Sequence, residues 1–280
     1  MLEPEEIIAQ INDWHNARNI TLQVQAGGKT NRNFLVTVDG EKFVLRIGGE
    51  NAAAIGICRA TECAAISAAA SVGIAPEVVA FFLPEGHLVT RFIEGVEWSV
   101  EDFKQPNVIK RVAETLRLVH ELPPIEGVFD PYQDIEQRIA TAKERGIDLP
   151  DRLEEFLVRM NVIRVQRQKS LGGRLGLCHN DPWHNNFIDD GTVRLLDWEF
   201  AGMGDPFFDL ASSAAVYSAE QKRTFLYTYF GEERTGALEE LEQMIFVVML
   251  WNATWALMQV GVGHTDIDYA GMAQHIFGRL

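Results

Sequence analysis

The sequence predicts an α+β protein in which a small, β-rich lobe is followed by a larger, mostly helical lobe. Two observations support this class. Strand-like runs around one Ala-rich helix fill the first ninety-odd residues, and segments of helical periodicity fill most of the rest. The chain has 280 residues, and roughly 150 residues are typical of one domain. We therefore expect lobes at residues 1–93 and 94–280, with a hinge near Glu94-Gly95, where glycine permits unusual backbone angles.

The elements of the first lobe follow from apolar spacing and turn signals. Asp39-Gly40 between two apolar runs is a strong hairpin signal, and Gly73 with Pro76 ends the Ala-rich helix. A glycine-led loop at 25–33 lies between the first two strands. The expected elements are a helix over 4–17, strands at 20–24, 34–38 and 42–47, a helix over 59–71, and strands at 78–83 and 87–92. The strands should form a mostly antiparallel sheet.

The second lobe has longer segments with a period of 3.6 residues. The segment 175–188 breaks this pattern and is dense in polar groups. The expected elements are helices over 108–122, 152–165, 218–230, 238–260 and 269–277, with a short strand at 193–196.

Composition and charge exclude several classes of protein. Apolar residues make up 47% of the chain, which is enough for a core, so extensive disorder is not expected. Lys and Arg number 25 against 40 Asp and Glu, which gives a net charge of −15. A chain this acidic repels nucleic-acid backbones, so we expect no nucleic-acid partner. The same charge suits a protein that handles a cationic small molecule.

The remaining features point to the cytoplasm. The acidic start Met1–Glu6 lacks the basic region of a signal peptide, and no window reaches the roughly 18 apolar residues of a membrane span. Cys58, Cys63 and Cys178 follow no metal spacing, and we expect reduced thiols. We expect a monomer or a homodimer.

The densest chemistry lies in the segment from Cys178 to Ile188. It carries Asp181 and Asn186 on one short loop, and Asp197 follows at the end of an apolar strand. Phosphoryl transfer needs such a set: one carboxylate to orient the acceptor hydroxyl and take its proton, and an amide oxygen and a second carboxylate to hold Mg²⁺. The sequence therefore predicts a phosphotransferase.

The pattern H-x-D-x-x-x-x-N followed by a strand-borne Asp resembles the protein-kinase-like superfamily. It is most similar to the small-molecule branch, the aminoglycoside phosphotransferases and choline/ethanolamine kinases, over nearly the whole chain. The resemblance implies a bilobal kinase fold, ATP as donor and Mg²⁺ as cofactor. It also implies Asp181 as the catalytic base, and Asn186 and Asp197 as metal ligands.

In that family the first lobe binds the nucleotide. The glycine-led loop offers small side chains and backbone N–H groups that can cradle phosphates. Its candidate ligands are Gly28, Thr30, Asn31 and Asn33. Arg46 occupies the place where protein kinases have Lys, and it resembles the Arg usual in choline/ethanolamine kinases. Arg can bind phosphate through two N–H groups, and Glu62 on the following helix looks like its ion-pair partner.

The segment after Asp197 also resembles bacterial choline kinases, through D-W-E-F-x-G-x-x-D-P-x-x-D-L-A. The resemblance implies that Asp209 braces the catalytic loop, while Asp205 before Pro206 is expected to cap a helix. No D-F-G or A-P-E segment is present, which argues against a protein kinase.

The acceptor is predicted to be a cationic alcohol such as choline or ethanolamine. Trp251 and Trp255 lie four residues apart on one helical face, and Tyr269 follows. Aromatic faces attract quaternary ammonium groups, although the same pair is compatible with core packing. Glu199 and Trp198 are the other candidate acceptor ligands. The alternatives are a kinase of thiamine, of an aminoglycoside or of another small alcohol, and a non-catalytic nucleotide-binding relative.

Overall fold

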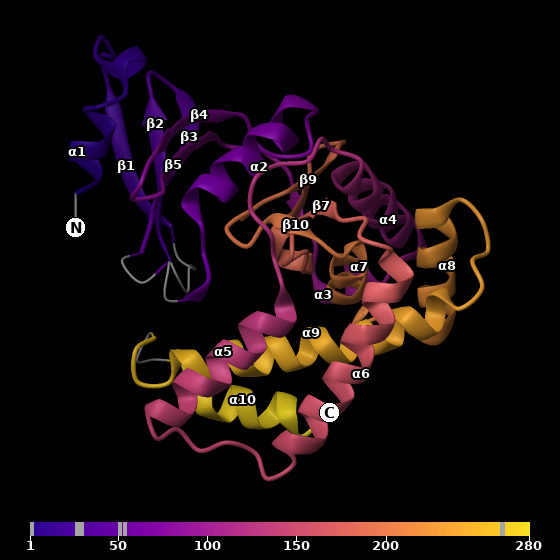
Figure 1. Ribbon diagram of the computed structural model, residues 1–280. Coiled ribbons are helices and arrows are strands. Elements are labelled where there is room, and N and C mark those ends of the chain that lie inside the picture. Colours follow the sequence, from indigo (N-terminus) through magenta and orange to yellow (C-terminus); the bar gives the residue numbers. More distant parts are fainter. Residues whose placement is uncertain (1–2, 26–30, 50–51, 53–54, 264–266) are drawn as a thin grey trace. The chain divides into compact units, whose positions relative to one another are not determined.

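The computed structural model describes residues 3–25, 31–49, 52, 55–263 and 267–280 (Figure 1). They divide into two compact units. The N-terminal unit comprises residues 1–97 and 185–200, and the helical unit comprises residues 98–184 and 201–280. The division differs from the expected one, because 185–200 returns to the N-terminal unit. Backbone pairing explains this return, since the Leu195 N–H donates to the Ile74 carbonyl at 2.7 Å.

An antiparallel sheet of five described strands dominates the N-terminal unit (Figure 1). Its order is β1-β2-β3-β5-β4. The strands are β1 (Ile20–Gln25), β2 (Arg32–Val38), β3 (Glu41–Ile47), β4 (Val78–Phe82) and β5 (His87–Arg91). Asp39 and Gly40 have φ of 49° and 97° between β2 and β3, as the mirror-image hairpin turn requires. The predicted hairpin is confirmed.

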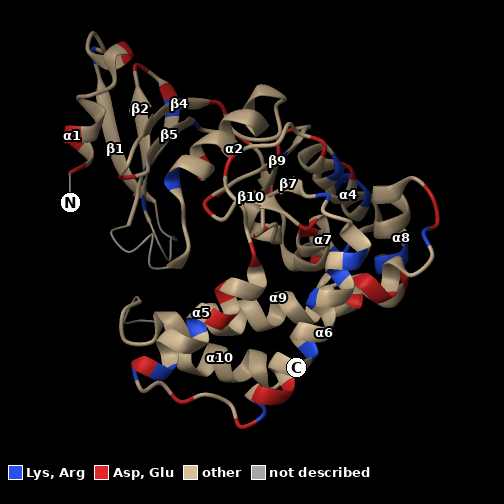
Figure 2. Ribbon diagram, in the orientation of Figure 1, with Lys and Arg blue, Asp and Glu red and all other residues tan. Residues whose placement is uncertain are grey.

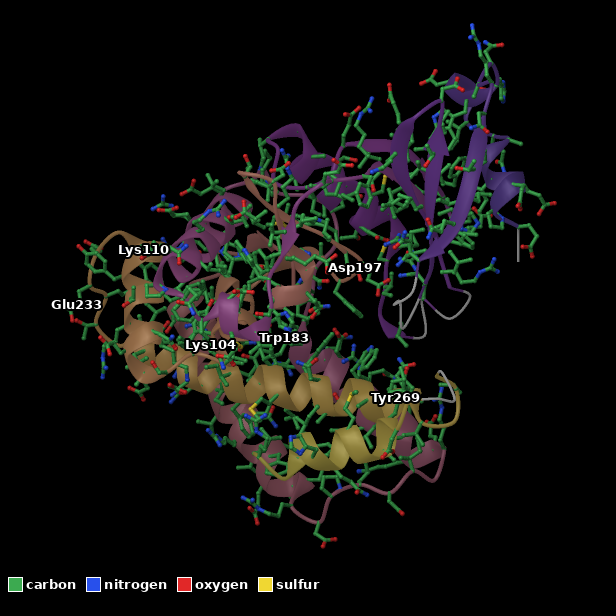
Figure 3. The ribbon with its side chains drawn as sticks, turned by 180° about the vertical axis from the view of Figure 1, so that it is seen from behind. Lys104, Lys110, Trp183, Asp197, Glu233 and Tyr269 are labelled. Carbon is green, nitrogen blue, oxygen red and sulfur yellow. The ribbon has the colours of Figure 1, made fainter. Side chains whose placement is uncertain are left out.

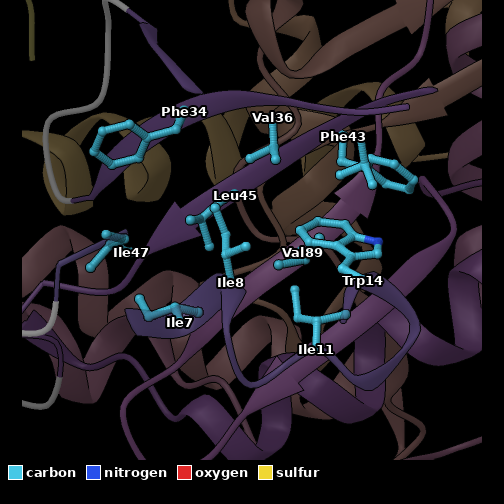
Figure 4. Packing of buried hydrophobic residues seen from close by; sticks show 11 residues of the cluster. Ile7, Ile8, Ile11, Trp14, Phe34, Val36, Phe43, Leu45, Ile47 and Val89 are labelled. Carbon is cyan, nitrogen blue, oxygen red and sulfur yellow. The ribbon is translucent and has the colours of Figure 1, made fainter. Parts of the chain in front are cut away.

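The first helix of the prediction is interrupted. The chain forms α1 (Pro4–Ile8) and a short 3₁₀ helix (Asn12–Trp14), with extended backbone at Ile11 between them. Figure 4 shows that Ile7, Ile8, Ile11 and Trp14 all reach one face of the sheet, as their spacing on one helical stripe predicts. The interruption lies before Asn12 and Asp13, residue types that favour the start of a helix over its interior, and these two residues begin the 3₁₀ helix.

Glu62, Asn186 and Asp197 lie on or beside the remaining elements of the N-terminal unit. Helix α2 (Arg59–Ser71) has its predicted bounds. A second, smaller sheet contains β6 (Val96–Glu97), β8 (Phe187–Asp189) and β9 (Val193–Leu195) in the order β6-β8-β9.

The helical unit is built around α9 (Ala237–Gln259), which packs against α5, α7 and α10. The other elements are α3 (Val100–Phe103), α4 (Pro106–His120), α5 (Pro131–Glu144), α6 (Leu153–Leu171), β7 (Gly176–Cys178), β10 (Gly202–Gly204), α7 (Pro206–Ala214), α8 (Ala219–Phe230) and α10 (Tyr269–Phe277). Figure 2 shows that most of α9 lacks charged residues. Its length and composition would suffice to cross a membrane, but 72% of its most apolar window is buried within the protein, as in a core helix.

Candidate active site

The loop that carries Asp181 is held by a buried carboxylate. Asp209 on α7 has no exposed surface, and it accepts the backbone N–H groups of His179 at 2.8 Å and Asn180 at 2.6 Å. His120, the last residue of α4, lies 3.0 Å from Asp209 through Nε2 and 2.7 Å from the Tyr229 hydroxyl through Nδ1. The brace expected at Asp209 is therefore present in the structure.

Asp181 itself is partly exposed, and the backbone on either side of it is held by hydrogen bonds. Its N–H donates to His179 Nδ1 at 3.3 Å, and its carbonyl accepts from Trp183 N–H at 2.9 Å. One residue on, the Pro182 carbonyl accepts from the Ser213 hydroxyl at 2.8 Å. Asn180 has φ of 66°, a left-handed conformation that Asn tolerates better than most residues. This backbone fixes where the Asp181 side chain begins while leaving the side chain accessible.

The two candidate metal ligands lie on the N-terminal unit. Asn186 directly precedes β8, Asp197 follows β9, and the Leu196 N–H donates to the Asn186 carbonyl at 2.8 Å. Asp197 also has a positive φ, 60°, and 44% of its side chain is exposed, which leaves its carboxylate open to a cation. An amide oxygen and a carboxylate on one hairpin are ligands of the kind that Mg²⁺ prefers.

The electrostatics at Asp197 suit a cation. Desolvation by surrounding atoms, with repulsion from Glu199 next in size, raises the pKa of Asp197 to about 7. Arg46 opposes this rise, because its Nη1 lies 3.8 Å from the Asp197 carboxylate. A divalent cation would favour the ionised carboxylate over the protonated one, so the residues present fit a bound metal.

The predicted ion pair between Arg46 and Glu62 is present. Both side chains are buried, and Arg46 also donates to the Gly86 carbonyl at 3.0 Å. Asn33 lies opposite Arg46 in the register of β2 and β3. Gly28 and Thr30 lie outside the described residues.

Sequence reasoning missed Arg59, the first residue of α2. It is 7% exposed, and it donates to Glu62 at 2.7 Å, to Glu199 at 3.4 Å and to Asn31 Oδ1 at 3.1 Å. Asn31 in turn donates to Glu199 at 2.8 Å. The only signal in the sequence is the spacing of Arg59 and Glu62, three residues apart on one helix.

Two tryptophans predicted to contact the acceptor are core residues instead. Trp198 has no exposed surface, and its indole N–H donates to the Leu195 carbonyl at 3.0 Å. Trp251 is 3% exposed, and the Arg138 guanidinium lies 4.2 Å from its ring centroid. A cation of the protein itself thus covers one face of the Trp251 ring.

Trp255 and Tyr269 form the aromatic pair that remains. Their rings meet edge to face, with centroids 6.0 Å apart. Trp255 is partly exposed, whereas Tyr269, labelled in Figure 3 at the start of α10, is 4% exposed. Its buried hydroxyl has no hydrogen-bond partner among the described residues.

Comparison with known proteins identifies the family. Residues 21–244 match the model of the phosphotransferase enzyme family, and the chain belongs to that family. The protein resembles Protein LicA of Haemophilus influenzae, with 26% identity over 210 residues that span 72% of this chain and 61% of LicA.

Solved structures with this fold include kinases of small alcohols. A choline/ethanolamine kinase family protein from Mesorhizobium loti aligns with a TM-score of 0.80 and 27% identity, over 98% of this chain and 91% of that one. The choline kinase LicA from Streptococcus pneumoniae aligns with a TM-score of 0.79 and 20% identity, over 98% and 97% of the two chains. The predicted fold class, α+β with a kinase-like arrangement, is confirmed.

Proposed function

We propose that the protein is an ATP- and Mg²⁺-dependent kinase that phosphorylates the hydroxyl of choline or ethanolamine. One observation carries the proposal: Asp181, Asn186 and Asp197 are all present, in the expected order, in a chain of the phosphotransferase enzyme family. The names of two similar structures, both of which refer to choline kinases, support the choice of acceptor.

In the proposed reaction Asp181 is the catalytic base. Its carboxylate accepts a hydrogen bond from the acceptor hydroxyl and takes its proton as the oxygen attacks the γ-phosphorus. The bond from phosphorus to the bridging oxygen breaks in line, and ADP leaves without a phosphoenzyme. The protein contributes mainly positioning, which is why a braced loop matters.

Asn186 and Asp197 would hold Mg²⁺, which when bound neutralises charge on the phosphate oxygens. Arg46, fixed by Glu62, would add a permanent positive charge for the same phosphates. Asn31 and Asn33 are the described candidates for contacts with the nucleotide.

The aromatic pair of Trp255 and Tyr269 would receive the ammonium group. A cation over an aromatic face is stabilised by about 0.5–2 kcal/mol, with the larger values in desolvated sites. A partly exposed Trp beside a buried Tyr gives such a surface.

The test is release of ADP from ATP and Mg²⁺ across choline, ethanolamine, thiamine and aminoglycosides. We expect choline or ethanolamine to stimulate release most strongly. Stimulation by thiamine or an aminoglycoside alone would replace the proposed acceptor. If none of these alcohols stimulated ADP release, but the protein still bound ADP, the non-catalytic alternative would be favoured.

A further inference from the structure

Two buried arginines share one buried glutamate in the N-terminal unit. Arg46 pairs with one carboxylate oxygen of Glu62, and Arg59 pairs with the other. Each arginine then reaches a different carboxylate of the turn after β9. Arg46 lies 3.8 Å from Asp197, and Arg59 lies 3.4 Å from Glu199. The turn that carries Asp197 and Glu199 is therefore linked to α2 by two separate sets of ion pairs, one through Arg46 and one through Arg59.

The bridge through Arg59 also includes the start of β2. Arg59, Glu199 and Asn31 form a closed triangle of hydrogen bonds, at 3.4, 2.8 and 3.1 Å. Asn31 belongs to the glycine-led loop and directly precedes β2, and its Oδ1 also accepts the Gly49 N–H at 3.3 Å. One guanidinium thus joins α2, the turn after β9 and the start of β2.

The surrounding backbone leaves space for this guanidinium. A Cβ atom at Gly86 would lie 2.2 Å from Arg59 Cδ, and Gly86 has φ of 76°. The same residue accepts a hydrogen bond from Arg46 through its carbonyl. A glycine is therefore needed here on two grounds, close approach and a left-handed conformation.

We propose that Arg59 is a positioning residue for the nucleotide and its metal, and that Glu199 anchors Arg59 rather than binding the acceptor. This inference rests on the proposed function for the roles of Asn31 and Asp197. Glu199 is 5% exposed, and both of its described partners belong to the triangle. By holding Asn31 and the turn of Asp197 to α2, Arg59 sets the spacing between a phosphate contact and a metal ligand.

The balance of charges around Arg59 supports its role as a positioning residue. The group contains two arginines, 46 and 59, and three carboxylates, 62, 197 and 199. Without Arg59, two buried carboxylates, Glu62 and Glu199, would lose a cationic partner. A buried charge that loses its partner is strongly destabilised, so these side chains would rearrange and the geometry around Asn31 would change.

The test compares Arg59→Met, Arg59→Lys and Glu199→Gln with wild type. Arg91→Met is the matched control, because Arg91 also pairs with two carboxylates, those of Glu41 and Glu77, but is exposed. For each variant, KM for ATP, KM for the acceptor, kcat, thermal melting and the Kd of Mg²⁺-ADP by calorimetry are measured.

We expect Arg59→Met and Glu199→Gln to raise the KM for ATP and the Kd of Mg²⁺-ADP about tenfold, the size expected when charge-assisted hydrogen bonds are lost. The acceptor KM should stay within about twofold, and Arg59→Lys should recover part of the ADP affinity, since it keeps the charge but not the fork of donors. A double variant that combines Arg59→Met with Glu199→Gln should have the same ADP affinity as whichever single variant binds ADP less tightly. The two effects should not add, because both changes break the same triangle of hydrogen bonds.

Two results would overturn the inference. If Glu199→Gln raised the KM of a cationic acceptor and left ADP binding unchanged, Glu199 would be an acceptor ligand. If Arg59→Met lowered the melting temperature but left both nucleotide constants unchanged, Arg59 would only stabilise the fold. The ADP titration needs no acceptor, so it separates this inference from the choice of choline. A wild type that turned over none of the acceptors, but bound ADP in an Arg59-dependent way, would support the inference against the proposed function.

Discussion

Asp181 combines a partly exposed side chain with a backbone that is fixed by hydrogen bonds. The loop is held by Asp209 and by the hydrogen bonds around Pro182, and none of these contacts uses the Asp181 carboxylate. Asp181→Asn should therefore keep the loop and lower kcat by about 10²–10⁴-fold, the usual contribution of general base catalysis. Steady-state kinetics with an ADP titration would check this, and ADP affinity should not change.

Asp190→Asn is the matched control for Asp181→Asn. Asp190 is an exposed partner of Arg194 on the β8–β9 hairpin, and its change should leave kcat unaltered. Near-normal turnover by Asp181→Asn would exclude Asp181 as the base.

The aromatic residues give a second prediction at this scale. Trp255→Ala should raise the KM for choline more than for ethanolamine, because a quaternary ammonium gains most from an aromatic surface. Trp251→Phe should leave both KM values similar and lower the melting temperature, since Trp251 packs under Arg138 and donates to Asp134 at 3.0 Å. Equal KM changes for the two acceptors in Trp255→Ala would make Trp255 a core residue.

At the scale of elements, His87 on β5 connects two strands of the large sheet. Its Nδ1 accepts the Gly48 N–H at 3.2 Å, just after β3. Desolvation lowers the pKa of His87 below 6.5, and Arg46 and Arg59 lower it further against the opposing effect of Glu85. The unfolded chain then binds more protons than the folded chain in the interval below pH 6.5.

His87 should consequently contribute stability that is complete above pH 6.5 and is lost as the pH falls below that value. Melting temperatures measured between about pH 7.5 and pH 5 would show the decrease, on top of losses from carboxylates. His87→Gln keeps an acceptor for Gly48 and does not titrate, so its melting temperature should change less over the same interval. If the melting temperatures of wild type and His87→Gln fell in parallel as the pH was lowered, His87 would not be the cause of the decrease.

Elements with strong local signals were predictable from sequence. The β2–β3 hairpin follows from alternation around Asp39-Gly40, and α2 from an Ala-rich run with breakers after it. Helix α5 was missed, although Asp130-Pro131 marks its start as Asp205-Pro206 marks that of α7. Both pairs place an Asp cap before a Pro that the first helical turn accepts.

The candidate site likewise contains residues that local sequence predicts and contacts that it does not. Asp181, Asn186 and Asp197 were predictable as candidates because they lie in one segment of 17 residues, 181–197, so local spacing carries the pattern. The triangle of Arg59, Asn31 and Glu199 was not, because its contacts join residues 28, 140 and 168 positions apart. The burial of Trp251 likewise depends on Arg138, which lies 113 positions away.

At the scale of the whole molecule, the net charge of −15 should affect encounter with a cationic acceptor. We expect kcat/KM for choline to fall as ionic strength rises from about 0.01 M to about 1 M, over which the Debye length shrinks from about 30 Å to about 3 Å. The uncharged isostere of choline, with carbon in place of nitrogen, should show little dependence on salt. If kcat/KM fell equally for choline and for its uncharged isostere, the salt would be acting on the binding of ATP or of the metal instead.

The return of residues 185–200 to the N-terminal unit has a consequence for biosynthesis. While a ribosome is still adding the helices after α2, β6 lacks β8 and the Ile74 carbonyl lacks the Leu195 N–H. Asn31 and Arg59 likewise await Glu199. The nascent chain must therefore keep this half-built unit from mispairing until residue 200 has emerged, so synthesis of the helical unit begins before the N-terminal unit can be completed.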